Sequence, residues 1–183
     1  MKAIKTLSML ILTIILTSSS YASVIRYLSL EELCMNSTDV VEVKVLSTKS
    51  FYYGDKNPRM YTSIRLRVLK TYLGNCKENE IIEIIQYGGT INDKTIFQVD
   101  GPIFKVDQTS FLFLKEFVSE IWGRNYRVYG MAEGKFNIKE DKIYRDNIDG
   151  PLKQHKNGVF YSISRTTPME KSIFINEIKK YMK

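Results

Sequence analysis

The chain has 183 residues, the size of a single domain, and its 27 basic residues against 20 acidic ones give it a net charge of +7. Its single histidine excludes a zinc site built from several histidines, and its two cysteines lack the CxxC spacing of zinc ribbons and thioredoxin-like redox motifs. Beyond the first two dozen residues, no apolar run is long enough to cross a membrane.

Residues 1–22 have the pattern of a cleavable signal peptide. Two lysines give a positive start, and the apolar run over residues 7–16 is about half of the roughly 20 residues that a membrane span needs. The small residues Ser20 and Ala22 suit the −3 and −1 positions of signal peptidase, which predicts cleavage between Ala22 and Ser23. The alternative is an uncleaved membrane anchor.

The remaining residues, 23–183, are expected to form one domain, and export would place it in the periplasm or outside the cell. In such an oxidising compartment, Cys34 and Cys76 are a candidate disulfide. The bond would close a loop of about 40 residues and contribute about 3–4 kcal/mol. The alternative is two buried or free thiols.

The first predicted elements are a short helix and a strand. Ser29 and Glu32 form a capping box that begins a helix, which ends near Asn36. Residues 40–45 then alternate between valines and charged side chains. This pattern predicts a half-buried strand with Val41, Val43 and Val45 in the core and the charged side chains facing the other way.

Two more strands follow a turn-rich loop at residues 53–58. Over residues 61–68, alternation places Ile64, Leu66 and Val68 in the core and two arginines in water. Residues 80–86 are apolar on both faces of the strand, which predicts that both faces are largely covered.

The second half of the chain predicts further short strands. Residues 110–114 form an apolar run typical of a buried strand. Three more strands are expected at residues 126–129, 135–138 and 142–144.

A helix is predicted at the end of the chain, over about residues 167–182. Thr167 suits the N-cap, Pro168 the first helical position and Glu170 the capping box. The apolar stripe of this helix is expected to pack on its own domain and consists of Phe174, Ile178 and Tyr181.

A search for catalytic patterns gives no candidate catalytic, cofactor-binding or metal-binding residue. His155 lies in a polar stretch and no serine has a nucleophile-elbow motif. The pair Gly88 and Gly89 lacks the spacing of a phosphate-binding loop. Nothing in the sequence indicates that the carboxylates of Asp100 and Asp107 lie close enough together to act as a catalytic pair.

Aromatic and basic residues are interleaved in two regions, a pattern that can bind nucleic acid on a small barrel. Export argues against a nucleic-acid partner, and aromatic side chains on strands are ordinary packing residues. The residues concerned are Tyr52, Tyr53, Arg59 and Tyr61, then Arg124, Tyr126, Arg127, Tyr129, Tyr144 and Arg145.

The order of these landmarks resembles a group of uncharacterised exported bacterial proteins with a small OB-like barrel. The matching positions, spread over residues 29–138, are Asp39, Val40, Val41, Tyr61, Thr62, Leu73, Gly74, Gly88, Gly89, Phe104, Leu112, Phe113, Leu114, Gly134 and Phe136. The layout is more distantly similar to the netrin-like domain of tissue inhibitors of metalloproteinases. That family chelates zinc through an N-terminal cysteine, whereas Ser23 would begin the mature chain here.

The resemblance implies a mainly β fold, a small OB-like (netrin-like) antiparallel barrel of five to seven strands with a short N-terminal helix and a C-terminal helix. The expected function is that of an exported, non-enzymatic binding or inhibitor-like module of the bacterial envelope or secretome. Barrel loops would contact an unknown protein partner. The alternatives are an envelope protein with weak affinity for anionic membrane surfaces and an enzyme with an unrecognised site.

Overall fold

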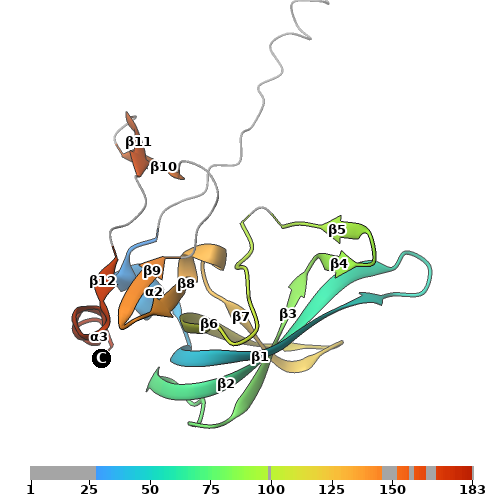
Figure 1. Ribbon diagram of the computed structural model, residues 1–183, viewed down its shortest axis with the longest axis horizontal. Coiled ribbons are helices and arrows are strands. Elements are labelled where there is room, and N and C mark those ends of the chain that lie inside the picture. Colours follow the sequence, from blue (N-terminus) through green and yellow to red (C-terminus); the bar gives the residue numbers. More distant parts are fainter. Residues whose placement is uncertain (1–27, 99, 146–151, 157–158, 164–167, 183) are drawn as a thin grey trace, which may run out of the picture.

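The computed structural model describes residues 28–98, 100–145, 152–156, 159–163 and 168–182 (Figure 1). The fold is mainly β, with helices at both ends of the described chain. The predicted signal peptide, with its cleavage site at Ala22 and Ser23, lies outside the described residues, as does Thr167.

The helices and strands alternate along the chain as follows: α2 (Leu30–Asn36), β1 (Asp39–Tyr53), β2 (Arg59–Leu73), β3 (Ile81–Tyr87), β4 (Gly89–Ile91), β5 (Lys94–Ile96), β6 (Thr109–Ser119), β7 (Gly123–Val128), the 3-10 helix η1 (Met131–Gly134), β8 (Lys135–Lys139), β9 (Lys142–Arg145), β10 (Leu152–Lys156), β11 (Val159–Ile163), β12 (Met169–Glu170) and α3 (Lys171–Lys179). The strands predicted from alternation are all present. The short strands β4, β5, β10, β11 and β12 were not predicted.

Eight strands form one sheet in the order β1-β2-β3-β7-β6-β8-β9-β12, and β1 also pairs with β6. The strands β1, β2, β3, β7 and β6 therefore form a ring of five. Neighbours in the sheet are antiparallel except β3 and β7, which pair in parallel through Ile84 and Tyr126. The expectation of a wholly antiparallel arrangement is wrong at this one pair.

Two apolar clusters lie on opposite faces of β1 and β6, because side chains alternate along a strand. The inner cluster, enclosed by the ring, includes Val41, Val43, Val45, Leu112 and Leu114 together with Ile64, Leu66 and Val68 of β2. The outer cluster lies between the sheet and the helices and includes Val40, Phe111, Phe113, Phe174 and Ile178. The predicted core faces of β1 and β2, the buried strand at residues 110–114 and the apolar stripe of α3 are thus confirmed.

The first helix begins as its sequence predicts, whereas the last helix does not. In α2, both hydrogen bonds of the capping box between Ser29 and Glu32 are formed. The predicted capping box ending at Glu170 is wrong, because Met169–Glu170 pairs with β9 as the strand β12 and α3 begins at Lys171. Of the helices in the described ranges, none has the length and apolar character needed to cross a membrane.

Two side chains lie in surroundings that local alternation does not predict. Glu42, expected on the solvated face of β1, is only 8% exposed. Its carboxylate is 2.7 Å from the Lys171 ammonium and accepts a hydrogen bond from the Tyr72 hydroxyl at 3.3 Å. Conversely, Ile81 of β3 is 46% exposed, so the prediction that both faces of β3 are covered is wrong.

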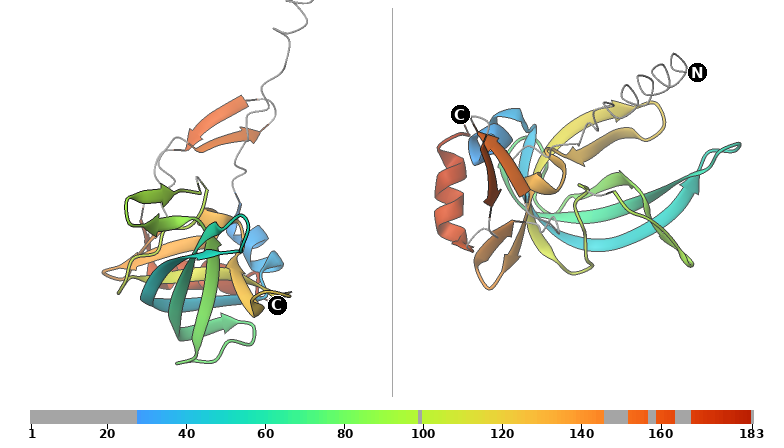
Figure 2. Two further views of the ribbon diagram at one scale, coloured as in Figure 1. Left: turned by 90° about the vertical axis from the view of Figure 1, so that its right-hand side faces the viewer. Right: turned by 90° about the horizontal axis from the view of Figure 1, so that it is seen from above.

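The molecule has a helical end and a hairpin end. The right-hand view of Figure 2 shows α2 and α3 together at one end of the sheet, while the β1–β2 and β6–β7 hairpins extend away from them. The hairpin end therefore consists of turns and strand ends that the helices leave uncovered.

Candidate binding surface

The two cysteines are free and buried in different apolar clusters, so the candidate disulfide is not formed. Cys34 belongs to the outer cluster and Cys76 to the inner cluster. Burial raises the pKa of the Cys34 thiol to about 11 and that of the Cys76 thiol to about 12. Such thiols are almost wholly protonated at neutral pH, so they suit packing and not nucleophilic chemistry.

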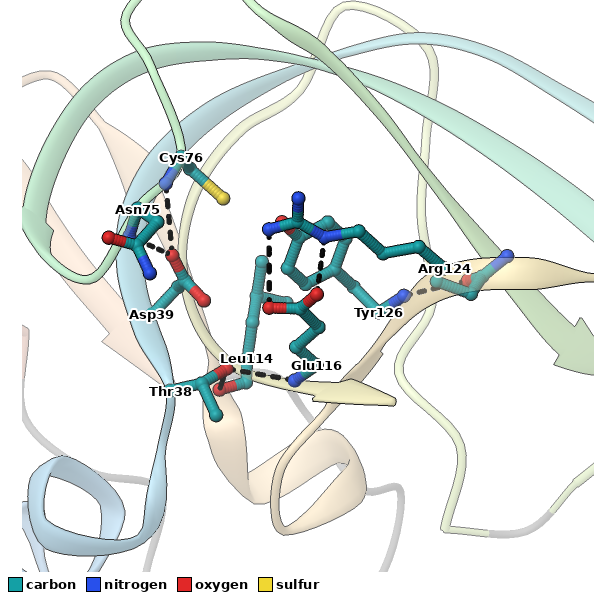
Figure 3. A network of polar contacts seen from close by, with 9 residues as sticks. Thr38, Asp39, Asn75, Cys76, Leu114, Glu116, Arg124 and Tyr126 are labelled. Carbon is teal, nitrogen blue, oxygen red and sulfur yellow. Dashed lines mark hydrogen bonds and ion pairs between the residues drawn. The ribbon is translucent and has the colours of Figure 1, made fainter. Parts of the chain in front are cut away.

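A polar network around Cys76 connects the turn after β2 to the start of β1 (Figure 3). The Asp39 carboxylate accepts hydrogen bonds from the backbone amides of Asn75 at 2.7 Å and Cys76 at 3.0 Å. At Gly74, φ is +97° and a Cβ atom would collide with Asp39 Oδ1 and Thr38 O, which accounts for glycine at this turn. The contacts of Asp39 are therefore satisfied within the fold.

The same network fastens the base of the β6–β7 hairpin (Figure 3). The Thr38 backbone amide donates to the Leu114 carbonyl at 2.8 Å, and the Thr38 hydroxyl accepts from the Glu116 amide at 2.8 Å. The Glu116 carboxylate in turn pairs with the Arg124 guanidinium across the hairpin. These contacts fix the direction in which the hairpin leaves the ring.

Five aromatic side chains meet at the hairpin end, and we call them the aromatic patch: Phe51, Tyr53, Tyr61, Tyr87 and Trp122. The ring centroid of Trp122 is 4.7 Å from that of Tyr53, 5.7 Å from that of Phe51 and 5.9 Å from that of Tyr61. Tyr61 and Tyr87 meet edge to face at 5.8 Å. These separations are those of favourable aromatic pairs.

Strand register explains how three of these residues come together. Phe51 of β1 lies opposite Tyr61 of β2, and Tyr61 lies opposite Tyr87 of β3. Tyr61 is three residues from Ile64 along β2 and so lies on the opposite face from the inner cluster. The patch is therefore separate from both apolar clusters.

The turn between β6 and β7 carries Trp122 to this row of rings. The Ser119 hydroxyl accepts hydrogen bonds from the backbone amides of Ile121 at 3.1 Å and Trp122 at 3.2 Å. Gly123 follows with φ of +64°, a conformation that favours glycine. The turn is thus held by its own hydrogen bonds, with Trp122 packed on the β1–β2 hairpin.

The patch and its surroundings are open to solvent. Tyr53 and Tyr87 are both 44% exposed, and in the adjoining β6–β7 hairpin Ile121 of the turn is 56% exposed and Val118, near the end of β6, is 81% exposed. Tyr and Trp are enriched in protein interfaces because they offer large, rigid contact areas with a polar edge. An arrangement of this kind is suited to binding an apolar segment of another molecule.

Sequence reasoning found part of this surface. Tyr53 and Tyr61 were among the interleaved aromatic residues, but Phe51, Tyr87 and Trp122 were not. Recognition of the turn at residues 53–58 gives the hairpin register, which pairs Phe51 with Tyr61, so this residue was within reach of the sequence.

The other candidate residues do not converge on a reactive site. His155 lies in β10, and Asp107 pairs with Lys44 at 2.9 Å while 78% exposed. Among the residues that the structure describes, no three His, Cys, Asp or Glu side chains are grouped so that they could hold a metal ion.

Comparison of the chain with protein-family models, with curated proteins and with solved structures gave no match.

Proposed function

We propose that this chain is an exported, non-enzymatic binding module of the bacterial envelope or secretome that contacts a protein partner through the loops at its hairpin end. The observation that carries this proposal is the aromatic patch. It is built by two hairpins and a third strand, lies outside both apolar clusters and leaves Tyr53 and Tyr87 each 44% exposed.

We propose further that the ring is OB-like. In chain order its strands are β1, β2, β3, β6 and β7, and they lie in the order β1-β2-β3-β7-β6 before returning to β1. A five-stranded Greek-key ring of this kind supports the assignment, as does the parallel pairing of β3 with β7. OB-folds bind oligonucleotides and oligosaccharides over their second and third strands and through the loops after the first and fourth strands. The aromatic patch lies on the equivalent strands and loops, which supports a binding role by analogy without indicating the class of partner.

The charges around the patch favour a partner with an apolar anchor over a strongly charged one. The tip of the β1–β2 hairpin carries exposed charges of both signs, at Asp55, Lys56 and Arg59. On the β6–β7 hairpin, Arg124 is already paired with Glu116. With charges of both signs and little net charge, most of the binding free energy would come from burying aromatic and apolar side chains.

Site-specific photo-crosslinking tests the proposal. A photoreactive amino acid is placed at Val118, which is 81% exposed near the end of β6, and in a matched variant at Lys139, which is exposed at the end of β8. Irradiation of the cells that produce the protein should give a discrete protein adduct from Val118 and not from Lys139. The same adduct from both positions, or none from Val118, would overturn the proposal.

A further inference from the structure

A cleft lies beside the aromatic patch and shares Tyr87 with it. It has a volume of about 420 Å³ and lies between strands β1–β3 and the segment that runs from β4 to Phe104. Figure 1 shows β4 and β5 alongside the outer parts of β1 and β2. A volume of this size is within the range of about 300–1,000 Å³ that is usual for ligand sites.

The lining of the cleft combines polar and apolar residues and carries no charge. No Asp, Glu, Lys or Arg side chain is among the described residues that line it, although 26% of the chain is charged. The polar lining consists of Thr48, Ser50, Thr62, Gln86, Thr90, Thr95 and Gln98. A charged ligand would lose hydration without gaining a counter-charge, so the lining favours a neutral ligand that forms many hydrogen bonds.

The hydroxyl groups inside the cleft are held in a fixed order. The Thr90 amide donates to Ser50 Oγ at 3.2 Å, Ser50 Oγ and Thr62 Oγ1 are 3.0 Å apart, and Thr62 Oγ1 donates to the Gly88 carbonyl at 2.8 Å. Since Thr62 uses its proton on Gly88, the Ser50 hydroxyl is the donor to Thr62. Each of the two oxygens then keeps a lone pair as an acceptor for a ligand hydroxyl.

A glycine brings these two hydroxyls close to the backbone. Gly89 has φ of +136°, and a Cβ atom there would collide with both Thr62 Oγ1 and Ser50 Oγ. The backbone thus approaches the hydroxyl pair more closely than any other residue at this position would allow.

An exposed aromatic ring stands at the same cleft. Phe97 lines it and is 63% exposed, whereas the Tyr87 ring packs on Tyr61, on the face of the sheet opposite Thr62. A ring face offers apolar contact to the C–H face of a sugar ring, while hydroxyl and amide groups bind the hydroxyls at its edge. Neutral charge, fixed acceptors and an exposed ring together describe the requirements of a carbohydrate.

We infer that the cleft between β1–β3 and the β4–β5 hairpin is a binding site for a neutral carbohydrate chain. This site is additional to the protein-binding role proposed for the aromatic patch and does not depend on it. The chain would then hold a glycan and a protein partner at adjoining surfaces of the hairpin end.

Titration of the isotope-labelled mature chain with three neutral probes, maltohexaose, cellohexaose and N-acetylchitohexaose, tests the inference by amide NMR. At least one probe should give saturable shifts at Gly88, Gly89 and Thr90. Phe97→Ala should weaken binding of that probe about tenfold because it removes the ring contact. Thr62→Val should weaken it to a similar extent, since a buried hydrogen bond to the ligand is worth about 1–2 kcal/mol. Phe97 is exposed, so its variant keeps the fold even if Thr62→Val is destabilised.

The control variant is Ile121→Ala, which changes the neighbouring turn and should leave carbohydrate binding unchanged. Absence of saturable binding with all three probes would overturn the inference. It would also be overturned if Phe97→Ala bound as tightly as the unmodified chain, or if only a neutral Ser/Thr-rich peptide produced shifts at the cleft. Loss of the protein adduct at Val118 would leave this result unaffected, so the two proposals fail separately.

Discussion

Replacing Arg145 with Met should destabilise the fold by leaving Glu133 buried without its counter-charge. The two side chains are 7% and 3% exposed, and the Arg145 Nη2 atom is 2.8 Å from Glu133 Oε2. The same nitrogen donates to the Leu28 carbonyl at 2.6 Å, and the guanidinium stands 5.1 Å from the ring centroid of Phe136. Removing one partner of a buried ion pair costs about 3–5 kcal/mol.

The cost should depend on pH in a direction that the structure specifies. Burial raises the pKa of Glu133 above its ordinary value, and the positive charge of Arg145 opposes this rise. A raised pKa in the folded state means that stability from this group is present at low pH and lost as the pH rises through that pKa. Without Arg145 the pKa rises further, so Glu133 becomes neutral more easily in acid. The loss caused by Arg145→Met should therefore be larger at pH 8 than at pH 5.

Urea unfolding of residues 23–183, followed by far-ultraviolet circular dichroism at pH 5 and pH 8, gives the free energies of unfolding. The double variant Glu133→Leu/Arg145→Met is the matched control, because it removes both charges and should be markedly more stable than the single variant at pH 8. A loss below about 1 kcal/mol for Arg145→Met at pH 8, or an equal loss at both pH values, would refute the reasoning.

Three further predictions concern the core, the thiols and one turn. Phe174→Ala should lower the free energy of unfolding in urea by about 3–5 kcal/mol, because Phe174 is 2% exposed in the outer cluster. The control Ile173→Ala, at a position 52% exposed, should lower it much less, and equal losses would contradict the packing of α3. Cys34 and Cys76, with pKa values raised to about 11 and 12, should react with a thiol reagent at pH 8 only after denaturation. Two reactive thiols per denatured chain are expected, and no reactive thiol after denaturation would indicate a disulfide. Gly74→Ala should lower the free energy of unfolding by about 1–3 kcal/mol because its Cβ meets Asp39 and Thr38, and an unchanged melting curve would show that the turn relaxes.

Features set by neighbouring residues along the chain could be predicted from the sequence. Val41, Val43 and Val45 define the core face of β1 by alternation alone, and they lie in the inner cluster. The capping box of Ser29 and Glu32 needs only four consecutive positions and is formed.

Features set by distant segments could not be predicted in this way. Glu170 has a local capping pattern, but pairing with Lys142 in β9 keeps it extended, so the helix begins at Lys171, three residues after the predicted first helical position at Pro168. Glu42 has the spacing of a solvated residue and is instead covered by Lys171, far along the chain. Ile81 has the apolar pattern of a covered position and is nevertheless 46% exposed.

The aromatic patch likewise depends on both local and distant segments of the chain. The hairpin turn gives the pairing of Phe51 with Tyr61, but Trp122 reaches them from another hairpin through a tertiary contact. Local patterns therefore identify the strands that build the aromatic patch and not the Trp122 side chain that completes it.

The most direct test of the proposed function is the affinity of the protein captured by crosslinking for residues 23–183 and for their Ile121→Asp variant, measured by titration calorimetry. Ile121 is 56% exposed, so the substitution places a charge beside the aromatic patch without disturbing either apolar cluster. Binding through the patch predicts a loss of at least about 30-fold, the effect of about 2 kcal/mol at an interface hot spot. A dissociation constant equal to that of the unmodified chain, with Lys139→Asp as the matched surface control, would contradict the account.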